Sequence, residues 1–214
     1  MDFLPSQPVL FAFTLAATVV ILAPGPDMTL FIGKTLAQGR RAGLVSYLGA
    51  TLGLVVHTLF AAWGLSALLA ASATAFTAVK IIGALYLFWL AIDAVINGST
   101  LSLSDTAPKP QRLSRVFLVG IGINLLNPKI ILFFVTFLPQ FISVSDPSAS
   151  AKLMFLGLYF ILLAVPICIA IIFLADRIAS SIKRSPRIMR FMDWVFASVF
   201  AGFAVRLLFE PARD

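Results

Sequence analysis

Two residues of opposite charge stand inside strongly apolar stretches of this chain, each directly after a proline. Asp27 follows the sequence PGP, and Lys129 follows the sequence NP. A charged side chain at the centre of a bilayer costs about 2.5–3.5 kcal/mol on insertion scales, and proline interrupts a helix. A carboxylate and an ammonium together complement the two charges of an amino acid. The pair therefore indicates a binding site for a zwitterion of that kind.

The segments that carry these charges have the composition of a membrane protein. Of the 214 residues, 60% are hydrophobic and 12% are charged, whereas soluble domains are roughly 45–50% apolar and 25% charged. No residue in 42–79 carries a formal charge, although one crossing of the bilayer needs only about 20 apolar residues. Because open strands would leave backbone groups unpaired in lipid, we expect these segments to be helices.

Charged residues and turn residues divide the apolar sequence into six predicted transmembrane helices. Their approximate bounds are 9–32, 44–70, 76–96, 116–142, 152–175 and 191–209. The first contains Pro26 and the fourth contains Pro128, so both are expected to be broken at these prolines. The predicted fold is an all-α integral membrane protein.

The basic residues predict the orientation of these helices. They gather in the first, third and fifth loops: Lys34, Arg40, Arg41, Lys109, Arg112, Arg115, Arg177, Lys183, Arg184, Arg187 and Arg190. Basic loops stay in the cytoplasm, so both termini are expected on the outer, periplasmic face. The net charge of +7 is then explained by topology and by the anionic head groups of the lipid bilayer. No nucleic-acid partner is expected.

A polar segment divides the six helices into two halves. We expect a first three-helix repeat at residues 1–98, a cytoplasmic polar linker at 99–114 and a second three-helix repeat at 115–214, all in one membrane domain. Halves with an odd number of crossings enter the membrane from opposite sides, which is the geometry of an inverted repeat. When the chain is slid so that Pro26 falls on Pro128, Gln38 falls on Gln140.

The two prolines predict half-helices whose N-termini face a shared cavity. Proline suits the first helical position, because the N–H groups there have no partner within the helix. Such a terminus carries the positive end of the helix dipole, which attracts anions. The negative charge of Asp27 is favourable at that position, whereas the positive charge of Lys129 is unfavourable there. A residue placed against its local preference is a candidate for function, and Lys129 is such a residue. Two structural interpretations stay open: Asp27 only caps its helix, and Lys129 only neutralises Asp27.

His57 and Cys168 are two further side chains in the spans with chemistry of their own. Imidazole titrates near neutral pH, so His57 is a candidate for proton coupling, as is Asp27. The alternative for His57 is a hydrogen-bonded residue of the helix core. The chain has one cysteine, which can form neither an internal disulfide nor a redox pair and is interpreted as buried and inert.

The motifs around these residues resemble those of the lysine-exporter family, also called LysE/RhtB. The resemblance lies in APGPD at 23–27, GIGINLLNPK at 120–129 and FLPQF at 137–141, and it covers nearly the whole chain. It implies a bacterial inner-membrane exporter of amino acids or their derivatives that is driven by the proton gradient. The positions carried over as substrate-binding are Pro24, Gly25, Pro26, Asp27, Asn127, Pro128 and Lys129.

Other functions fit the sequence less well. An exporter of a metal or another small inorganic ion is the main alternative. It should show clustered His, Asp, Glu or Cys within the spans, where Asp27 and His57 are the only good candidates. A thiol redox enzyme would need a cysteine in each half. We therefore expect no enzymatic activity, no cofactor and no metal site, and nothing in the sequence indicates an oligomer.

Overall fold

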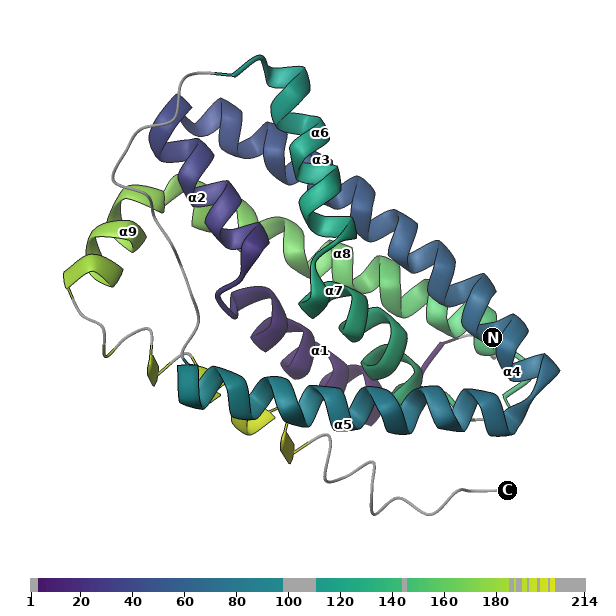
Figure 1. Ribbon diagram of the computed structural model, residues 1–214. Coiled ribbons are helices and arrows are strands. Elements are labelled where there is room, and N and C mark those ends of the chain that lie inside the picture. The colour runs from purple at the N-terminus through teal and green to yellow at the C-terminus, as the bar shows by residue number, and fades with distance from the viewer. Residues whose placement is uncertain are drawn as a thin grey trace.

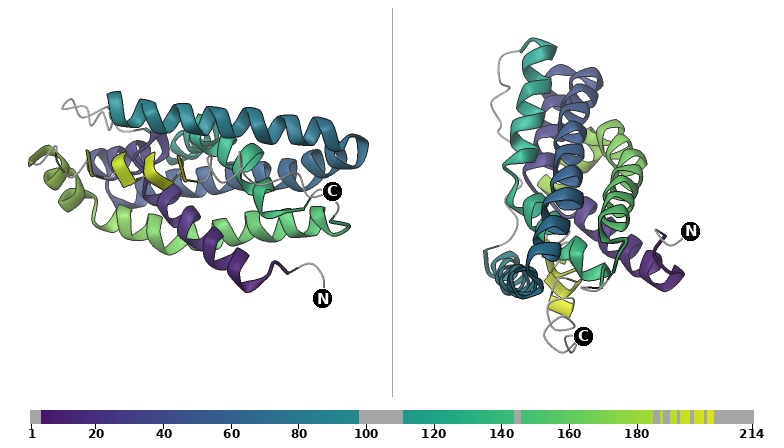
Figure 2. Two further views of the ribbon diagram at one scale, coloured as in Figure 1. Left: turned by 90° about the horizontal axis from the view of Figure 1, so that it is seen from below. Right: turned by 90° about the vertical axis from the view of Figure 1, so that its right-hand side faces the viewer.

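The computed structural model describes residues 4–97, 111–143 and 146–184, together with 187, 190–191, 193–195, 197–199 and 201–202. Within these ranges the chain forms helices and turns and no strands, which confirms the predicted all-helical class. The helices pack into one elongated bundle (Figure 1). The long helix α5 (Ala73–Asn97) lies along one edge of it (Figure 2).

The first and fourth predicted spans each consist of two helical parts. α1 (Gln7–Leu22) and α2 (Pro26–Gln38) meet at a bend of 50°. A second bend of 50° separates α6 (Leu113–Leu125) from α7 (Pro128–Leu132). The helical path that begins with α7 continues to Phe141. Each second part begins at a proline, whose fixed φ and missing N–H suit the first helical position. The bends therefore fall where the backbone already lacks a donor.

The second and fifth predicted spans are single helical paths. α3 (Arg40–Leu59) runs through a π-helical turn at Phe60–Leu65 into α4 (Ser66–Ala71). α8 (Ala149–Phe173) is separated by one residue from the short helix α9 (Ala175–Arg184). α3 and α8 pack against each other and form the long walls of the bundle (Figure 1).

The described residues provide two to four candidate membrane spans. Arg40–Leu68 and Ala149–Phe173 are each long and apolar enough to cross a membrane, and the two bent pairs qualify if each pair counts as one span. The predicted third span lies within α5. The predicted sixth span, 191–209, and the linker, 99–114, lie largely outside the described residues. The count of six spans and the inverted repeat therefore stay predictions.

The first basic loop is shorter than the sequence suggests. The charge pattern places Lys34 in a loop, but α2 continues to Gln38 and α3 begins at Arg40, so Lys34 is helical. Gly39 alone separates the two helices, and its φ of 84° lies in a region that glycine adopts without steric cost. Long cationic side chains can reach lipid head groups from a helix end, so basic residues need not mark the loop itself.

Phenylalanine rings from three elements form the centre of the core. Phe13 of α1 contacts Phe133, which directly follows α7, at a centroid distance of 6.0 Å. Phe133 in turn contacts Phe160 of α8 at 4.5 Å. All three side chains are buried. This cluster packs α1 against the continuation of α7 and against α8, so it fixes the position of one broken span relative to the other.

Glycines bring α3 and α6 into backbone contact. A Cβ atom added at Gly49 would lie 2.2 Å from the carbonyl oxygen of Phe117, and one added at Gly120 would lie 2.3 Å from that of Ser46. No side chain fits at either distance. Close approach through small residues is common between membrane helices. Here the glycines allow α3, from the first half of the chain, to pack directly against α6, from the second half.

Gly120→Ala should therefore destabilise the protein. Its methyl group would meet a backbone carbonyl of the packed helix, and overpacking of this kind costs roughly 1–3 kcal/mol. Gly122→Ala is the matched control, because a Cβ atom there has no neighbour within 4 Å. Thermal unfolding in detergent should show a lower midpoint for Gly120→Ala but not for Gly122→Ala. Equal midpoints for the two variants would contradict the backbone contact.

Candidate functional site

The beginnings of α2 and α7 are joined by one side chain. Asn127 precedes α7, and its side-chain oxygen accepts a hydrogen bond from the N–H of Lys129 at 3.1 Å. The Nδ2 group of the same residue donates to Asp27, the second residue of α2, at 3.0 Å. Asn127 thus closes the start of one half-helix and holds the carboxylate of the other. From this point the two helices lead away in opposite directions (Figure 1).

Asp27 is a buried residue with one carboxylate oxygen in use and one without a partner. Oδ2 accepts hydrogen bonds from the amides of Asn124 and Asn127, each at 3.0 Å. Oδ1 has no hydrogen-bond partner among the described residues. Neither oxygen accepts from a backbone N–H of α2 there, so Asp27 does not act as a hydrogen-bonding cap. A buried carboxylate oxygen in this state is free to accept a further hydrogen bond.

The ammonium of Lys129 lies at the end of α1. Nζ donates to the carbonyl of Val20 at 3.1 Å and to that of Ala23 at 2.8 Å. The last carbonyls of a helix lack helical partners and form the negative end of its dipole, which favours a cation. The side chain therefore leaves the unfavourable start of α7 and reaches a favourable position on α1. A cation at the start of α7, which the sequence shows to be unfavourable, is therefore tolerated because the side chain of Lys129 carries its ammonium to the end of α1.

Gly25 leaves room for this ammonium. A Cβ atom at Gly25 would lie 3.2 Å from Nζ of Lys129 and 3.4 Å from its Cε. A larger residue would press on the end of the lysine side chain. Gly25 lies in the bend, directly before α2. The glycine of the PGP sequence thus lies against the end of the Lys129 side chain, and its backbone is extended rather than left-handed.

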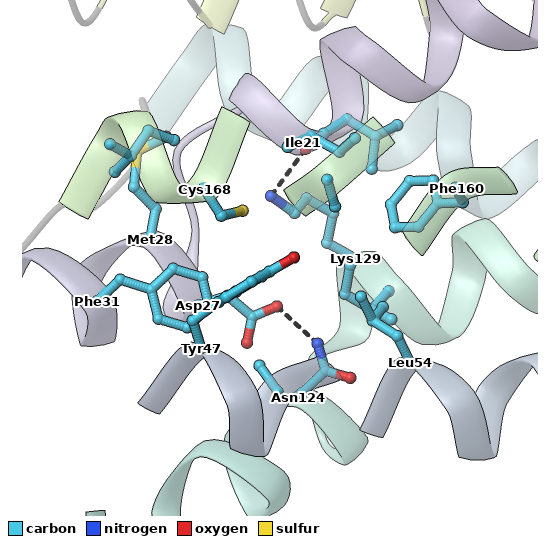
Figure 3. Close-up of a pocket in the computed structure, with 15 residues that line it drawn as sticks. Ile21, Asp27, Met28, Phe31, Tyr47, Leu54, Asn124, Lys129, Phe160 and Cys168 are labelled. Atoms are coloured by element: carbon cyan, nitrogen blue, oxygen red, sulfur yellow. Dashed lines mark hydrogen bonds between the residues drawn. The ribbon is translucent and has the colours of Figure 1, made fainter. Parts of the chain in front are cut away.

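Asp27 and Lys129 both line one cavity between the helices (Figure 3). Its 15 lining residues come from α1, α2, α3, α6, α7 and α8, and its empty space amounts to about 470 Å³, part of it open to the surface. The enclosed part of this space is small, with a cavity volume of about 40 Å³. In the described structure the ammonium is bound to carbonyl groups and forms no ion pair with Asp27. Lys129 is thus held by hydrogen bonds to α1, and it attracts the Asp27 carboxylate without direct contact.

Tyr47 and Asn124 belong to this site, although neither is among the candidates that the sequence predicts. Tyr47 of α3 lines the cavity and is 5% exposed, and its hydroxyl has no hydrogen-bond partner within the described ranges. Asn124 of α6 holds Asp27, as described above. Asn124 could have been found, because it is the one polar side chain in the apolar stretch 116–126. Tyr47 carried no comparable signal.

His57 lies behind the cavity wall. Its Nε2 is 3.4 Å from the backbone carbonyl oxygen of Asn124, and its ring stacks on Phe134 with a centroid distance of 5.6 Å. It does not line the cavity. Cys168 does line it and is buried, so the thiol expected to be inert faces the same space as Asp27 (Figure 3). The described residues contain no group of three or more His, Cys, Asp or Glu that could hold a metal ion.

Comparison with known proteins agrees with the motifs at the two breaks. The family model of LysE type translocators matches residues 18–211. The chain belongs to this family. The resemblance of the PGPD and NPK sequences is thereby confirmed, and the LysE family places the chain among membrane translocators.

Named relatives cover nearly the full length of this LysE family member. A membrane protein of Vibrio cholerae is 36% identical over 92% of this chain and 94% of its own. A homoserine/homoserine lactone efflux protein of Salmonella typhimurium is 33% identical, covering 89% and 91%. A leucine efflux protein of Enterobacter sp. is 29% identical, covering 92% and 93%. No solved structure is significantly similar to the chain.

Proposed function

We propose that this LysE family transporter exports an amino acid, or a close derivative of one, from the cytoplasm. The observation that carries the proposal is a carboxylate and an ammonium at two helix breaks, both lining one cavity. An α-amino acid presents the two complementary charges on two groups bound to the same carbon atom. The names of two relatives refer to the efflux of homoserine and leucine, which carry both charges, and of homoserine lactone, which keeps the ammonium but has no free carboxylate.

The free groups of the site suggest how the substrate lies. Oδ1 of Asp27 has no partner in the described structure and can accept a hydrogen bond from the substrate ammonium. A lysine ammonium has three donors, and Lys129 uses two of them on Val20 and Ala23. The third is left for the substrate carboxylate. Because Asp27 itself occupies the positive start of α2, we assign the carboxylate to Lys129 rather than to that helix terminus.

The proposed membrane is the bacterial inner membrane, with both termini on the periplasmic side. This orientation rests on the basic residues between the first and second, third and fourth, and fifth and sixth predicted spans. The inverted repeat of 1–98 and 115–214 is supported by the placement of Pro26 and Pro128, each at the start of a half-helix. In transporters of that design, the substrate binds where the two repeats meet.

Proton coupling is the third part of the proposal, and Asp27 is the first candidate to carry the proton. A carboxylate that receives a substrate ammonium cannot hold a proton at the same oxygen, so the two ligands would compete at Asp27. Intramembrane carboxylates commonly serve as proton relays. His57 ranks second, because it contacts the backbone of Asn124 and lies outside the cavity wall.

Counterflow in proteoliposomes tests this function. Vesicles containing the purified protein and loaded with one unlabelled amino acid should take up the same amino acid in labelled form, and protein-free vesicles should not. An imposed pH gradient should drive net accumulation, and a protonophore should abolish it. Failure of every amino acid and amino-acid derivative in a broad panel to exchange would contradict the proposed function. Exchange without net accumulation in response to the pH gradient would contradict proton coupling but not amino-acid transport.

A further inference from the structure

Among the described residues that line the cavity, the charged groups are the two that any amino acid would occupy. Asp27 and Lys129 are the formally charged residues among its 15 described lining residues. Leu54 and Phe160 lie on one side of the charged pair, and Met28 and Phe31 lie on the other (Figure 3). A third charge on a substrate would therefore face an apolar wall without a partner.

We propose that the transporter is selective for amino acids whose side chain is uncharged, and that Tyr47 binds their carboxylate together with Lys129. This inference rests on the proposed function, because it assigns the substrate class of the same site. The substrate ammonium and carboxylate use both charges of the cavity, and the apolar wall receives the side chain. Lysine, arginine, glutamate and aspartate each carry one charge too many for this arrangement.

Tyr47 supplies the donor that the carboxylate still lacks. A carboxylate has two oxygens that accept hydrogen bonds, whereas Lys129 has one donor left after its bonds to Val20 and Ala23. The Tyr47 hydroxyl forms no hydrogen bond of good geometry in the described part of the chain, although Thr51 lies close enough to interact with it, and it points into the space between Asp27 and Lys129 (Figure 3). Thr51, one turn further along α3, already donates its own hydroxyl to the backbone carbonyl of Tyr47 at 2.9 Å.

The ring of Tyr47 is held in this direction by its neighbours. Phe31 packs edge-on against it, with ring centroids 5.5 Å apart and planes at 88°. Both rings belong to one buried cluster that also contains Cys168 and Ile172 of α8. The hydroxyl is therefore positioned before any substrate arrives, which reduces the entropy that binding would otherwise cost.

The selectivity is tested with pairs of competitors that differ in charge. The amino acid exchanged best in the counterflow screen is the labelled substrate, and the competitors are glutamine against glutamate, asparagine against aspartate, and norleucine against lysine. An unpaired buried charge should make the charged member of each pair at least roughly a hundredfold weaker. A charged member within tenfold of its partner would overturn the selectivity. If no amino acid exchanges at all, the proposed function fails instead.

Tyr47→Phe tests the second part, because it removes the hydroxyl and keeps the ring. Loss of one hydrogen bond to the charged carboxylate should weaken the apparent affinity for every transported amino acid roughly ten- to hundredfold while leaving the ratio within each competitor pair unchanged. Tyr159→Phe is the control, because the Tyr159 hydroxyl lies 3.0 Å from Oγ1 of Thr14 and does not line the cavity. Wild-type affinity in Tyr47→Phe, or an equal loss in both variants, would overturn the role of Tyr47.

Discussion

Lys129→Met should abolish export while the protein still reaches the membrane. Methionine keeps an unbranched chain of similar length but has no ammonium to hold the substrate carboxylate. A hydrogen bond to a charged group contributes roughly 1.5–3 kcal/mol, which corresponds to a ten- to hundredfold loss of affinity. The carbonyls of Val20 and Ala23 lose their donor in the same variant, so a lower thermal stability is expected as well.

The control for this variant is Lys34→Met. Lys34 also lies in a helix of the first broken span, but its ammonium donates to Oε1 of Gln111 at 2.9 Å and does not line the cavity. We expect Lys34→Met to export normally. Export rates and membrane abundance would be measured for both variants in the same cells. Normal export by Lys129→Met at normal abundance would show that the site is assigned wrongly.

Asp27→Ala should be the most damaging change at the second charge, and Asp27→Asn should be milder. Alanine removes the acceptor of both the Asn124 and the Asn127 amides. Two buried donors are then unpaired, at roughly 1–3 kcal/mol each. Asparagine keeps an oxygen for these donors and loses the charge that would bind the substrate ammonium. We therefore expect low abundance and no export for Asp27→Ala, and normal abundance with reduced export for Asp27→Asn.

The pH dependence of transport separates the roles of Asp27. If its carboxylate carries the coupled proton, whatever export remains in Asp27→Asn should no longer respond to a pH gradient. The double variant Asp27→Asn with Lys129→Gln tests whether the charges serve stability alone, because it leaves no buried charge unpaired. Under our proposal it folds but does not export. A normal export rate in the double variant would mean that the two charges are structural.

The sequence was sufficient to locate the breaks but not the contacts across them. Pro26 and Pro128 act on their own backbone, so their position at the start of α2 and α7 follows from local chemistry. The direction of the Lys129 side chain depends on the end of α1, which is distant in sequence and is positioned by packing around Phe133. Rules for a single helix therefore identified the residue and not its partner.

Tyr47 could not be identified as a site residue from the sequence. Within an uncharged, apolar stretch, a tyrosine resembles an ordinary core or interfacial aromatic residue. Its importance arises because α3 lies beside the start of α2, where Phe31 orients the ring toward the cavity. Helix boundaries were uncertain for a related reason: nothing in the sequence distinguishes Lys34 within a helix from Lys34 in a loop until the path from α2 to α3 is known.

The glycine contact between α3 and α6 indicates which parts of the transporter can move. Rotation of the two halves as separate rigid bodies would have to pull Gly49 away from Phe117 and Gly120 away from Ser46. Close-packed contacts of this kind resist gradual deformation. We therefore expect α3 and α6 to remain together as a fixed axis through the transport cycle. The bends at Leu22–Pro26 and Leu125–Pro128 would then act as the joints, with α1 and α7 swinging about the axis to expose the cavity to one side of the membrane at a time.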